Sequence, residues 1–590
     1  MNEIVKACPA LGQVLNADPS LKAVLADLEK HSLTGSFAKY LAGADAQAVR
    51  TFLEDAGRLD LSRIEFHQQA RRRGEQQVLS INDVAPVPLV TLEKQQARRA
   101  GDASAGRDSL ADGRWASVAF AGGAGTRFFS HLEELEEALP RPNEALLDRK
   151  FDPSEPKGNF PISPVGGLSF YENIIAEALA AAVDCGRVPW VLFMTSPVTH
   201  DHTVRLLEAG GLWGFPKEYL VPFMQAQEPR LDEDGDLIVM DDSGHLAFTG
   251  DGHGGVYRAL LAGDNLLRKI TADGVAHLVM HNVDNPAARP FAPARLGFHL
   301  REGALFTLSG VRKTDPAEKV GLLMQLKKSG RVEVVEYNVL SQEVARARDE
   351  ETGRLQHEAG NANTNLIAAE AVRPDIEPTL YTGKTVPSRR GPVTSSSLEM
   401  LNQHITRLLD PQRVRAYEVE RREFFMPTKN ITGADSAEST NRMLSDRFAK
   451  KLSQAGAEVH PDALCDLHPA CTEMGPGLKL EAGARIYMGA RQSDAQGAPV
   501  CDGPLVLEPG SSLVVYASRP YGDIRADSSR QIKIDAAKAS QLKIGSGVTI
   551  KKGVRVVLRI GPGTRLTIPA GREISQDIQG EVGPGEDQEL

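Results

Sequence analysis

The sequence predicts an α/β protein that carries a helical region before it and a small β-domain after it. Apolar residues recur at helical spacing in the first hundred residues. Short apolar runs then alternate with helical patterns between about residues 116 and 337. Beyond about Pro461, Gly- and Pro-containing turns separate short strand-like triplets. We therefore divide the chain into a helical region at 1–108, an α/β domain at 109–455 and a β-domain at 456–590.

The helical region is defined by two apolar stripes and by its end. The stripes comprise Leu21, Val24, Leu25 and Leu28, and then Val49, Phe52 and Leu53. The stretch from Gly101 to Gly113 is rich in Gly, Ala, Ser and Asp, a composition typical of linkers. We expect this stretch to connect the helical region to the α/β domain.

The α/β domain is predicted from apolar runs that alternate with helical patterns. The expected strands are 116–121, 190–195, 277–283, 305–311, 320–326 and 332–337. The expected helices include 171–183, 199–208 and 256–270. This alternation predicts a largely parallel sheet, with its ligand site outside the carboxyl ends of the strands.

The β-domain shows an apolar-x-apolar triplet that recurs with glycine turns. The triplets are 478–480, 505–507, 542–544, 548–550, 556–558 and 566–568. The recurrence is typical of a β-helix, although its period is irregular. The acidic, Gly-rich tail from Gly580 is expected to fray.

Composition excludes several classes of protein. The 590 residues carry 68 Lys+Arg against 78 Asp+Glu, for a net charge of −10, so no global attraction to nucleic acid or an anionic membrane is expected. No apolar run approaches the ~18 residues of a membrane span. The start, Met1 to Ile4, lacks the features of a signal peptide, and five cysteines argue against a disulfide framework. These observations predict a cytoplasmic protein.

A glycine loop, Ala121-Gly122-Gly123-Ala124-Gly125-Thr126-Arg127, follows the first strand of the α/β domain. Such glycines let backbone N–H groups approach an anion or a flat base. The dinucleotide fingerprint fails because Phe128 stands where its third glycine belongs, and no Gly-Lys-Ser/Thr follows to make a P-loop. A plain tight turn and a phosphate site both remain open, and Arg127 favours the phosphate site.

Further motifs follow the glycine loop along the chain. They are 156–161 (PKGNFP), 194–196 (MTS), Gln225, 252–258 (GHGGVYR), 283–285 (VDN), 313–321 (KTDPAEKVG) and 422–430 (REFFMPTKN). Together with the glycine loop they resemble the uridylyltransferase family that includes UDP-glucose and UDP-N-acetylglucosamine pyrophosphorylases. The resemblance covers about residues 116–430 and implies a nucleotide-sugar transferase fold, GT-A or Rossmann-like, with a mixed sheet.

The motifs look most like the N-acetylglucosamine branch, but three features depart from it. Residues 128–154 form an insertion, acidic around 133–137, that separates Arg127 from Lys157. His253 stands where that branch has Asn, and is more like the glucose branch. Asn363-Thr364-Asn365 breaks the pattern that usually follows Asn361. The preferred sugar therefore stays open between glucose and N-acetylglucosamine.

The resemblance implies a reaction in which UTP and a sugar-1-phosphate give a UDP-sugar and pyrophosphate, with Mg²⁺ as cofactor. The roles that it implies are as follows: Arg127, Lys157 and Lys429 hold phosphates; Gly122, Gly123, Gln225 and Gly252 bind the nucleotide; and His253, Asn285 and Asn361 line the sugar. Asp284, at the end of an apolar strand, is the best ligand for Mg²⁺ on its chemistry alone.

Other interpretations remain. A catalytically silent nucleotide-sugar-binding or scaffold protein is the alternative from another class. Zinc could be bound by His460, Cys465, His468 and Cys471, but their spacing fits no usual zinc motif. The run from Thr199 to His202 is read as a capped helix start rather than a metal site. The oligomeric state and the roles of the N-terminal region, the insertion and the β-domain are left open.

Overall fold

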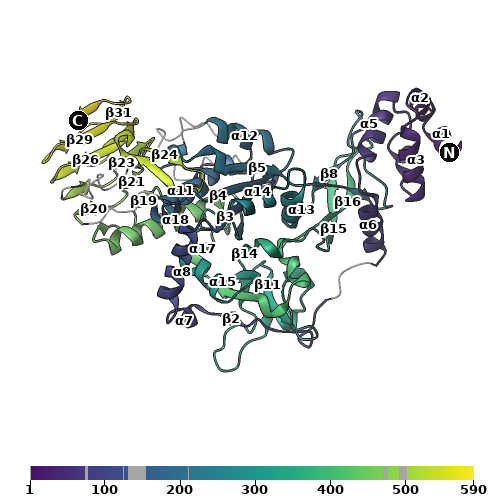
Figure 1. The fold of residues 1–590 in the computed structure, drawn as a ribbon, viewed down its shortest axis with the longest axis horizontal. Helices are drawn as coiled ribbons and strands as arrows, with labels where there is room; N and C mark the ends of the chain where they lie inside the picture. Colours follow the sequence, from purple (N-terminus) through teal and green to yellow (C-terminus); the bar gives the residue numbers. More distant parts are fainter. Residues whose placement is uncertain are drawn as a thin grey trace.

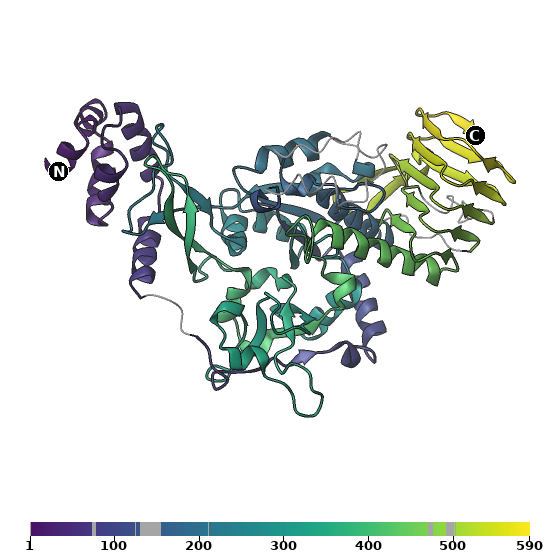
Figure 2. The same ribbon diagram turned by 180° about the vertical axis from the view of Figure 1, so that it is seen from behind.

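The chain forms three parts in a row, with the N-terminal helices and the C-terminal strands at opposite ends of the molecule (Figures 1 and 2). The computed structural model describes residues 2–73, 78–123, 125–129, 155–209, 212–469, 476–490, 501 and 503–590. No helix in these ranges is long and apolar enough to cross a lipid bilayer.

The N-terminal part is helical, as predicted. Its helices are α1 (Asn2–Ala7), α2 (Ala10–Ala17), α3 (Leu21–Lys30), α4 (Gly35–Lys39), α5 (Ala46–Ala56) and α6 (Leu61–Arg73). Their apolar stripes pack together and onto Leu231 and 237–239, beside the strands β7 (Leu231–Asp232), β15 (Thr379–Val386) and β16 (Val393–Glu399). Tyr40 donates its hydroxyl to Asp232 at 2.6 Å, which ties the helices to this small sheet.

The central part is built on a twelve-stranded mixed sheet within the described ranges. Its strands are β1 (Val84–Pro86), β2 (Leu89–Val90), β3 (Trp115–Phe120), β4 (Trp190–Thr195), β5 (Leu220–Met224), β9 (His277–Asn282), β10 (Phe306–Arg312), β11 (Leu322–Leu326), β12 (Val332–Val335), β13 (Ala359–Asn361), β14 (Thr364–Ala368) and β17 (Val414–Glu418). All six predicted strands are present. The expectation of a largely parallel sheet is confirmed for β5-β4-β3-β9, and β17 also pairs in parallel with β10 and β2.

Most of the remaining pairings are antiparallel, which corrects the prediction for that half of the sheet. A parallel pair needs a crossover of a dozen or more residues between its strands. Only residues 327–331 separate β11 from β12, so this pair can form only a hairpin. Strand β3 is buried throughout, as a central parallel strand covered on both faces should be.

Helices flank the sheet. They are α7 (Leu92–Gln95), α8 (Arg99–Ala111), α9 (Thr126–Phe129), α11 (Phe170–Cys185), α12 (His200–Ala209), α13 (Val256–Leu261), α14 (Leu266–Ala272), α15 (Pro293–Arg301), α16 (Gln342–Arg346), α17 (Arg421–Phe424) and α18 (Ala437–Gln454). The predicted helix 256–270 is two helices, because Asn265 adopts φ +53° and caps α14. A short pair, β6 (Gln227–Pro229) and β8 (Phe248–Gly250), lies off the main sheet.

The predicted linker at Gly101–Gly113 is wrong, because most of it forms helix α8. The small residues serve close packing instead of flexibility. A Cβ on Gly106 would lie 1.9 Å from the Pro293 carbonyl oxygen, and one on Gly297 would lie 1.8 Å from that of Asp102. Helices α8 and α15 therefore touch through their backbones, and the boundary drawn at 108/109 falls inside a helix.

We expect Gly106→Ala to lower the free energy of unfolding by about 1–3 kcal/mol, since the added methyl forces two helices apart. Gly101→Ala is the matched control in the same helix, because nothing lies within 4 Å of its Cβ position. That change should stabilise by about 0.5–1 kcal/mol through helix propensity. Thermal melting at a fixed scan rate compares the two, and an unchanged melting temperature for Gly106→Ala would contradict the close packing.

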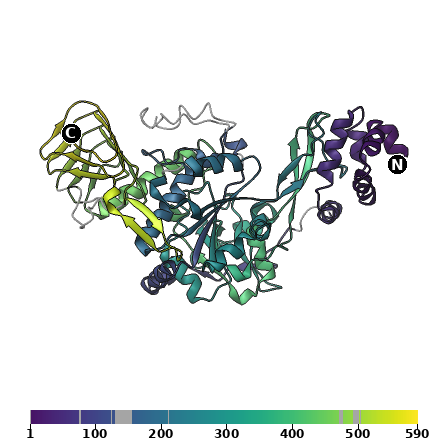
Figure 3. The same cartoon turned by 45° about the horizontal axis from the view of Figure 1, so that its top comes forward.

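Among the described residues of the C-terminal part, three sheets of three or more strands have strand pairs that are all parallel. One sheet holds β18 (Glu458–Val459), β20 (Leu478–Leu480), β22 (Leu505–Leu507), β27 (Val548–Ile550) and β30 (Glu573–Ile574); a second holds β19 (Leu464–Leu467), β21 (Arg485–Met488), β23 (Ser512–Ala517), β28 (Arg555–Ile560) and β31 (Ile578–Val582); the third holds β26 (Gln541–Ile544), β29 (Arg565–Ile568) and β32 (Asp587–Glu589). Within each sheet the strands lie side by side, and the yellow-green strands of this part are stacked along one end of the molecule (Figure 3). A hairpin of β24 (Asp523–Ala526) and β25 (Ile532–Asp535) projects from them.

The tail from Gly580 does not fray, contrary to expectation. Strand β31 pairs with β28 and β32 pairs with β29, so the tail completes two of the sheets. The buried side chains of this part form one continuous core with Phe448 and Leu452 of α18 and with α11. The C-terminal part is therefore packed against the α/β domain rather than tethered to it.

Candidate functional site

Three parallel strands end at one edge of the central sheet and carry the predicted motifs there. Phe120 of β3 pairs with Asn282 of β9 and with Met194 of β4. The glycine loop follows β3, and Asp284 and Asn285 follow β9. Because parallel strands expose their carboxyl ends together, these segments meet at the same edge of the sheet.

Lys157 and Asp284 are in direct contact at this edge. The Lys157 ammonium lies 2.9 Å from Asp284 Oδ2 and also donates to the Thr428 carbonyl oxygen. The Thr428 N–H donates to the Asp284 carbonyl oxygen at 3.0 Å. The ammonium further lies 4.9 Å from the ring centroid of Phe128. Three predicted segments, around 157, 284 and 429, are thus joined by bonds among Lys157, Asp284 and Thr428.

The Lys157–Asp284 pair is only partly satisfied, which leaves capacity for a ligand. Lys157 is 8% exposed, so its charge is largely removed from water. Asp284 Oδ1 is buried and has no hydrogen-bond partner in the described part of the chain. A buried carboxylate oxygen without a donor is costly unless a cation or a donor reaches it.

Lys429 lies beside this pair but differs from Lys157 in being exposed. Its N–H donates to the Asp435 carbonyl oxygen at 2.6 Å, which fixes the backbone around it. Burial raises the pKa of the Asp435 and Glu336 carboxyls, and the nearby Lys429 charge opposes both shifts. The motifs assign neither acid a role in the site: Glu336 supports the family resemblance only as part of Glu336-Tyr337, and no motif marks Asp435.

Gln225 lies between two glycines. A Cβ on Gly122 would lie 2.6 Å from its Nε2, and a Cβ on Gly250 would lie 2.1 Å from the same atom. The Gln225 N–H donates to the Thr195 carbonyl oxygen at the end of β4, at 2.9 Å. The Gln225 amide therefore packs directly against the backbone of Gly122 and Gly250, and Gly250 is a neighbour that the sequence did not reveal. Gly123 is exposed.

Gly252 and His253 form a tight turn against the chain at Met400. Gly252 has φ +82°, and a Cβ there would lie 2.4 Å from the Met400 carbonyl oxygen. The His253 ring stacks on Phe120, with centroids 5.3 Å apart and planes at 25°. Burial lowers the pKa of His253 to about 4, so the ring is neutral at pH 7.

The tautomer of His253 follows from its neighbour. The backbone N–H of Asn402 donates to His253 Nδ1 at 3.1 Å. A neutral imidazole that accepts at Nδ1 carries its hydrogen on Nε2. His253 therefore offers a donor, and no second acceptor, to whatever lies beside Nε2.

Asn402 belongs to a buried network of asparagine side chains. Its Nδ2 donates to Asn363 Oδ1 at 2.8 Å, and its Oδ1 accepts from Asn365 Nδ2 at 2.9 Å. Asn363 in turn donates to Asn282 Oδ1 at 3.0 Å. The network links His253 to the end of β9. The sequence carried a sign of Asn363 and Asn365, because residues 363–365 break the family pattern after Asn361. Nothing in the sequence marked Asn402.

The side chains of Asn361 and Asn285 make different hydrogen bonds. Asn361 Oδ1 accepts the Asn363 N–H at 3.0 Å. Asn285, which is 3% exposed, accepts the N–H of Met426 at 3.0 Å and donates to the Phe424 carbonyl oxygen at 2.9 Å. The Asn285 amide thus anchors the segment after α17, which leads to Lys429.

Some predicted residues cannot be placed, and the zinc alternative at His460, Cys465, His468 and Cys471 stays untested because Cys471 is one of them. The Arg127 side chain, insertion residues 130–154 and Cys471 lie outside what the structure describes. In the described ranges, three metal-type ligands converge only at Asp232, Asp234 and Asp236. Lys39 forms ion pairs with Asp232 and Asp234 and so neutralises part of that group.

Comparisons with known proteins show which proteins the chain is similar to. A family model described as UTP–glucose-1-phosphate uridylyltransferase matches residues 156–444. UDP-N-acetylglucosamine diphosphorylase 2 of Arabidopsis thaliana is 27% identical over 468 residues, covering 74% of this chain and 86% of that protein. UDP-N-acetylglucosamine pyrophosphorylase of Saccharomyces cerevisiae is 27% identical over 396 residues, covering 63% of this chain and 77% of that protein.

A solved structure shares the fold. The uridine diphosphate N-acetylglucosamine pyrophosphorylase of Trypanosoma brucei, crystallised with an inhibitor, aligns with a TM-score of 0.56 at 22% identity, over 75% of this chain and 85% of that one. The family model, the relatives and the shared fold point the same way as the order of the motifs. The family model and the curated relatives support the UDP-sugar pyrophosphorylase family for this chain.

Proposed function

We propose that this chain is a uridylyltransferase that makes a UDP-sugar and pyrophosphate from UTP and a sugar-1-phosphate. The main support for the proposal is the contact between Lys157 and Asp284 at 2.9 Å. This contact lies at the edge of the sheet where the glycine loop begins. Release of pyrophosphate from UTP, measured with a panel of sugar-1-phosphates, tests it. A catalytically silent nucleotide-sugar binder would bind UTP and release nothing with any sugar.

In the proposed reaction an oxygen of the sugar phosphate attacks the α-phosphorus of UTP, and pyrophosphate leaves as the α–β bond breaks. No side chain forms a covalent bond, so catalysis is positioning and neutralisation of charge. Lys157 is held by Asp284 and Thr428, and would meet the triphosphate without reorganising. We assign Arg127 to the same group of phosphates. Lys429, on the exposed side, would meet the incoming sugar phosphate.

The nucleotide base would lie beside Gln225 and the glycine loop that includes Gly122. Glycines lack a Cβ and so let a planar base approach the backbone closely. The Gln225 amide offers one donor and one acceptor, which suits the edge of uracil. Gly123 and Gly252 would border the same base.

The residues present fit Mg²⁺. Mg²⁺ in such sites takes one or two carboxylates together with phosphate oxygens and water. Asp284 Oδ1, buried and without a hydrogen-bond partner in the described ranges, would hold it. The ion would supply charge neutralisation between the phosphates when bound.

The sugar is glucose or N-acetylglucosamine, and His253 is the residue we expect to influence the choice, with Asn361 and Asn285 nearby. An acetamido group needs space and polar partners, whereas His253 is larger than Asn and offers a single donor at Nε2. A site discriminates strongly only when a wrong sugar clashes or leaves a buried group unpaired. We therefore propose that glucose-1-phosphate is accepted.

His253→Asn should shift product formation toward the N-acetyl sugar by about tenfold, the effect of one polar contact. The measurement is a competition of both sugar phosphates in one tube with UTP, followed by product masses. His245→Asn is the control. Nδ1 of His245 lies 3.0 Å from Asp55 Oδ2, and Asp55 belongs to the N-terminal helix α5. An unchanged ratio would show that His253 does not set specificity.

Two finer proposals concern the fold and the place of action. The α/β domain would be of the GT-A type, and the three parallel sheets would wind as a β-helix. The charge balance and the low cysteine count support a cytoplasmic location.

A further inference from the structure

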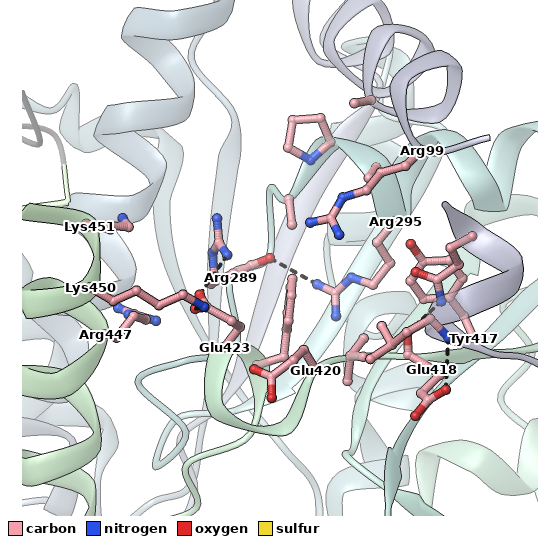
Figure 4. A pocket seen from close by; sticks show the side chains of 18 of the residues that line it. Arg99, Arg289, Arg295, Tyr417, Glu418, Glu420, Glu423, Arg447, Lys450 and Lys451 are labelled. Carbon is pink, nitrogen blue, oxygen red and sulfur yellow. Dashed lines mark hydrogen bonds and ion pairs between the residues drawn. The ribbon is translucent and has the colours of Figure 1, made fainter. Parts of the chain in front are cut away.

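A cavity of about 490 Å³ lies between α8, the segment 289–295, α17 and α18 (Figure 4). Neither Gln225 nor any residue of the glycine loop lines it. We call it the basic groove. Its cationic residues are Arg99, Arg107, Arg289, Arg295, Arg447, Lys450 and Lys451. Its acidic residues are Glu418, Glu420 and Glu423. The lining thus carries an excess of positive charge in a protein whose net charge is −10.

Arg447 is the most unusual member of the basic groove. It is 6% exposed, yet its Nε and Nη1 have no hydrogen-bond partner in the described part of the chain. Arg447, with Arg289 and Lys451, also lines a second cavity of about 270 Å³ that adjoins the first. A buried guanidinium with unpaired donor atoms is costly, and an anion that accepts a hydrogen bond from it would lower the cost.

Two of the three carboxylates of the basic groove, Glu418 and Glu423, are already engaged. Glu423 lies 3.5 Å from Arg289 and 3.9 Å from Lys450. Glu418 accepts the Leu92 N–H at 2.9 Å and pairs with Arg312 at 3.1 Å. They therefore offset only part of the charge, and none of them bonds Arg447 Nε or Nη1.

We propose that the basic groove binds a small phosphorylated molecule at a site separate from the catalytic one. A phosphate group offers several acceptor oxygens, and Arg presents donors in a matching fork. The cavity is larger than a phosphate and falls in the range of small-molecule sites. Leu92, Val419 and Phe424 supply apolar surface for the organic part of such a ligand.

The position of the basic groove connects it to the proposed active site. Phe424 lines the groove, and its carbonyl oxygen accepts from Asn285, which is next to Asp284. Met426 bonds Asn285 as well and lies three residues before Lys429. A ligand that contacts α17 is therefore in contact with the segment that leads to Lys429.

The test is equilibrium binding of inorganic phosphate and of glycerol 3-phosphate to the full chain at low ionic strength. The variant Lys450→Gln/Lys451→Gln removes two groove charges without disturbing the buried Arg447. We expect it to weaken binding of both probes at least tenfold. Lys30→Gln/Lys328→Gln removes two exposed charges elsewhere and should leave binding unchanged.

Further arms separate the groove from the active site and from the choice of ligand. Lys429→Ala should retain groove binding, and retained binding in a chain that fails to transfer uridylyl groups would still support this inference. Glycerol 3-phosphate should bind more tightly than phosphate, and glycerol should not bind. Binding that survives in Lys450→Gln/Lys451→Gln, or that is lost in Lys429→Ala, overturns the proposal. Equal affinity for the two probes would contradict the proposal that the groove also contacts the organic part of the ligand. Arg447→Gln is a second variant, and if folded it should also lose binding.

Discussion

Replacing Asp284 with alanine should reduce kcat at least ~100-fold, a loss of about 3 kcal/mol of transition-state stabilisation. Asp284 fixes Lys157 at 2.9 Å, and its free Oδ1 is the proposed ligand of Mg²⁺. Its loss removes the metal-positioning group and loosens a phosphate-binding lysine at once. Steady-state kinetics at saturating Mg²⁺ measures the effect, and near-normal turnover would contradict the assignment.

A second variant separates catalysis from stability. Lys157 is 8% exposed, so Asp284→Ala leaves a buried cation without its carboxylate, and the melting temperature should fall. In Asp284→Ala/Lys157→Met the stranded charge is gone, so the melting temperature should recover while turnover stays low. Recovery of turnover together with stability would mean that Asp284 acts only by holding the fold.

Lys429→Ala should lower kcat by about 100-fold, the scale for removal of one preorganised charge at the reacting phosphates. The KM for UTP should change little, because this lysine is assigned to the sugar phosphate. Its side chain is exposed, so the melting temperature should be unchanged. Initial rates with UTP and sugar phosphate varied separately give both constants.

Lys328→Ala is the matched control, an exposed lysine with no assigned role, and should behave as the unmodified chain. A Lys429→Ala variant that raises only the KM for the sugar phosphate, at full kcat, would show uniform binding rather than transition-state stabilisation. A selective rise in the KM for UTP would instead place Lys429 on the triphosphate.

The sequence predicted the strand ends well because the strands that carry the motifs are local patterns. Buried parallel strands read as continuous apolar runs, so β3, β4 and β9 were found, and with them the segments after each strand. The contact between Lys157 and Asp284 then follows from the fold, since it joins residues 127 positions apart.

The missed features all depend on contacts between distant residues. Asn402 bonds His253 and Asn363 from far along the chain, and an asparagine in a 3₁₀ turn carries no sign of such partners. Helix α8 looked like a linker because it is rich in small residues. Those residues allow the backbone of α15 to approach closely, which the sequence does not show. The tail looked unstructured because its strands are stabilised by the preceding sheets rather than by their own composition.

The fate of the UTP phosphates tests the central claim most directly. With a sugar-1-phosphate present, label from [α-³²P]UTP should appear in the UDP-sugar, and label from [γ-³²P]UTP should appear only in pyrophosphate. That pattern requires attack at the α-phosphorus, the reaction for which Lys157, Asp284 and Lys429 are assigned. Bound UTP with no transfer, or γ-label released as inorganic phosphate, would contradict the account.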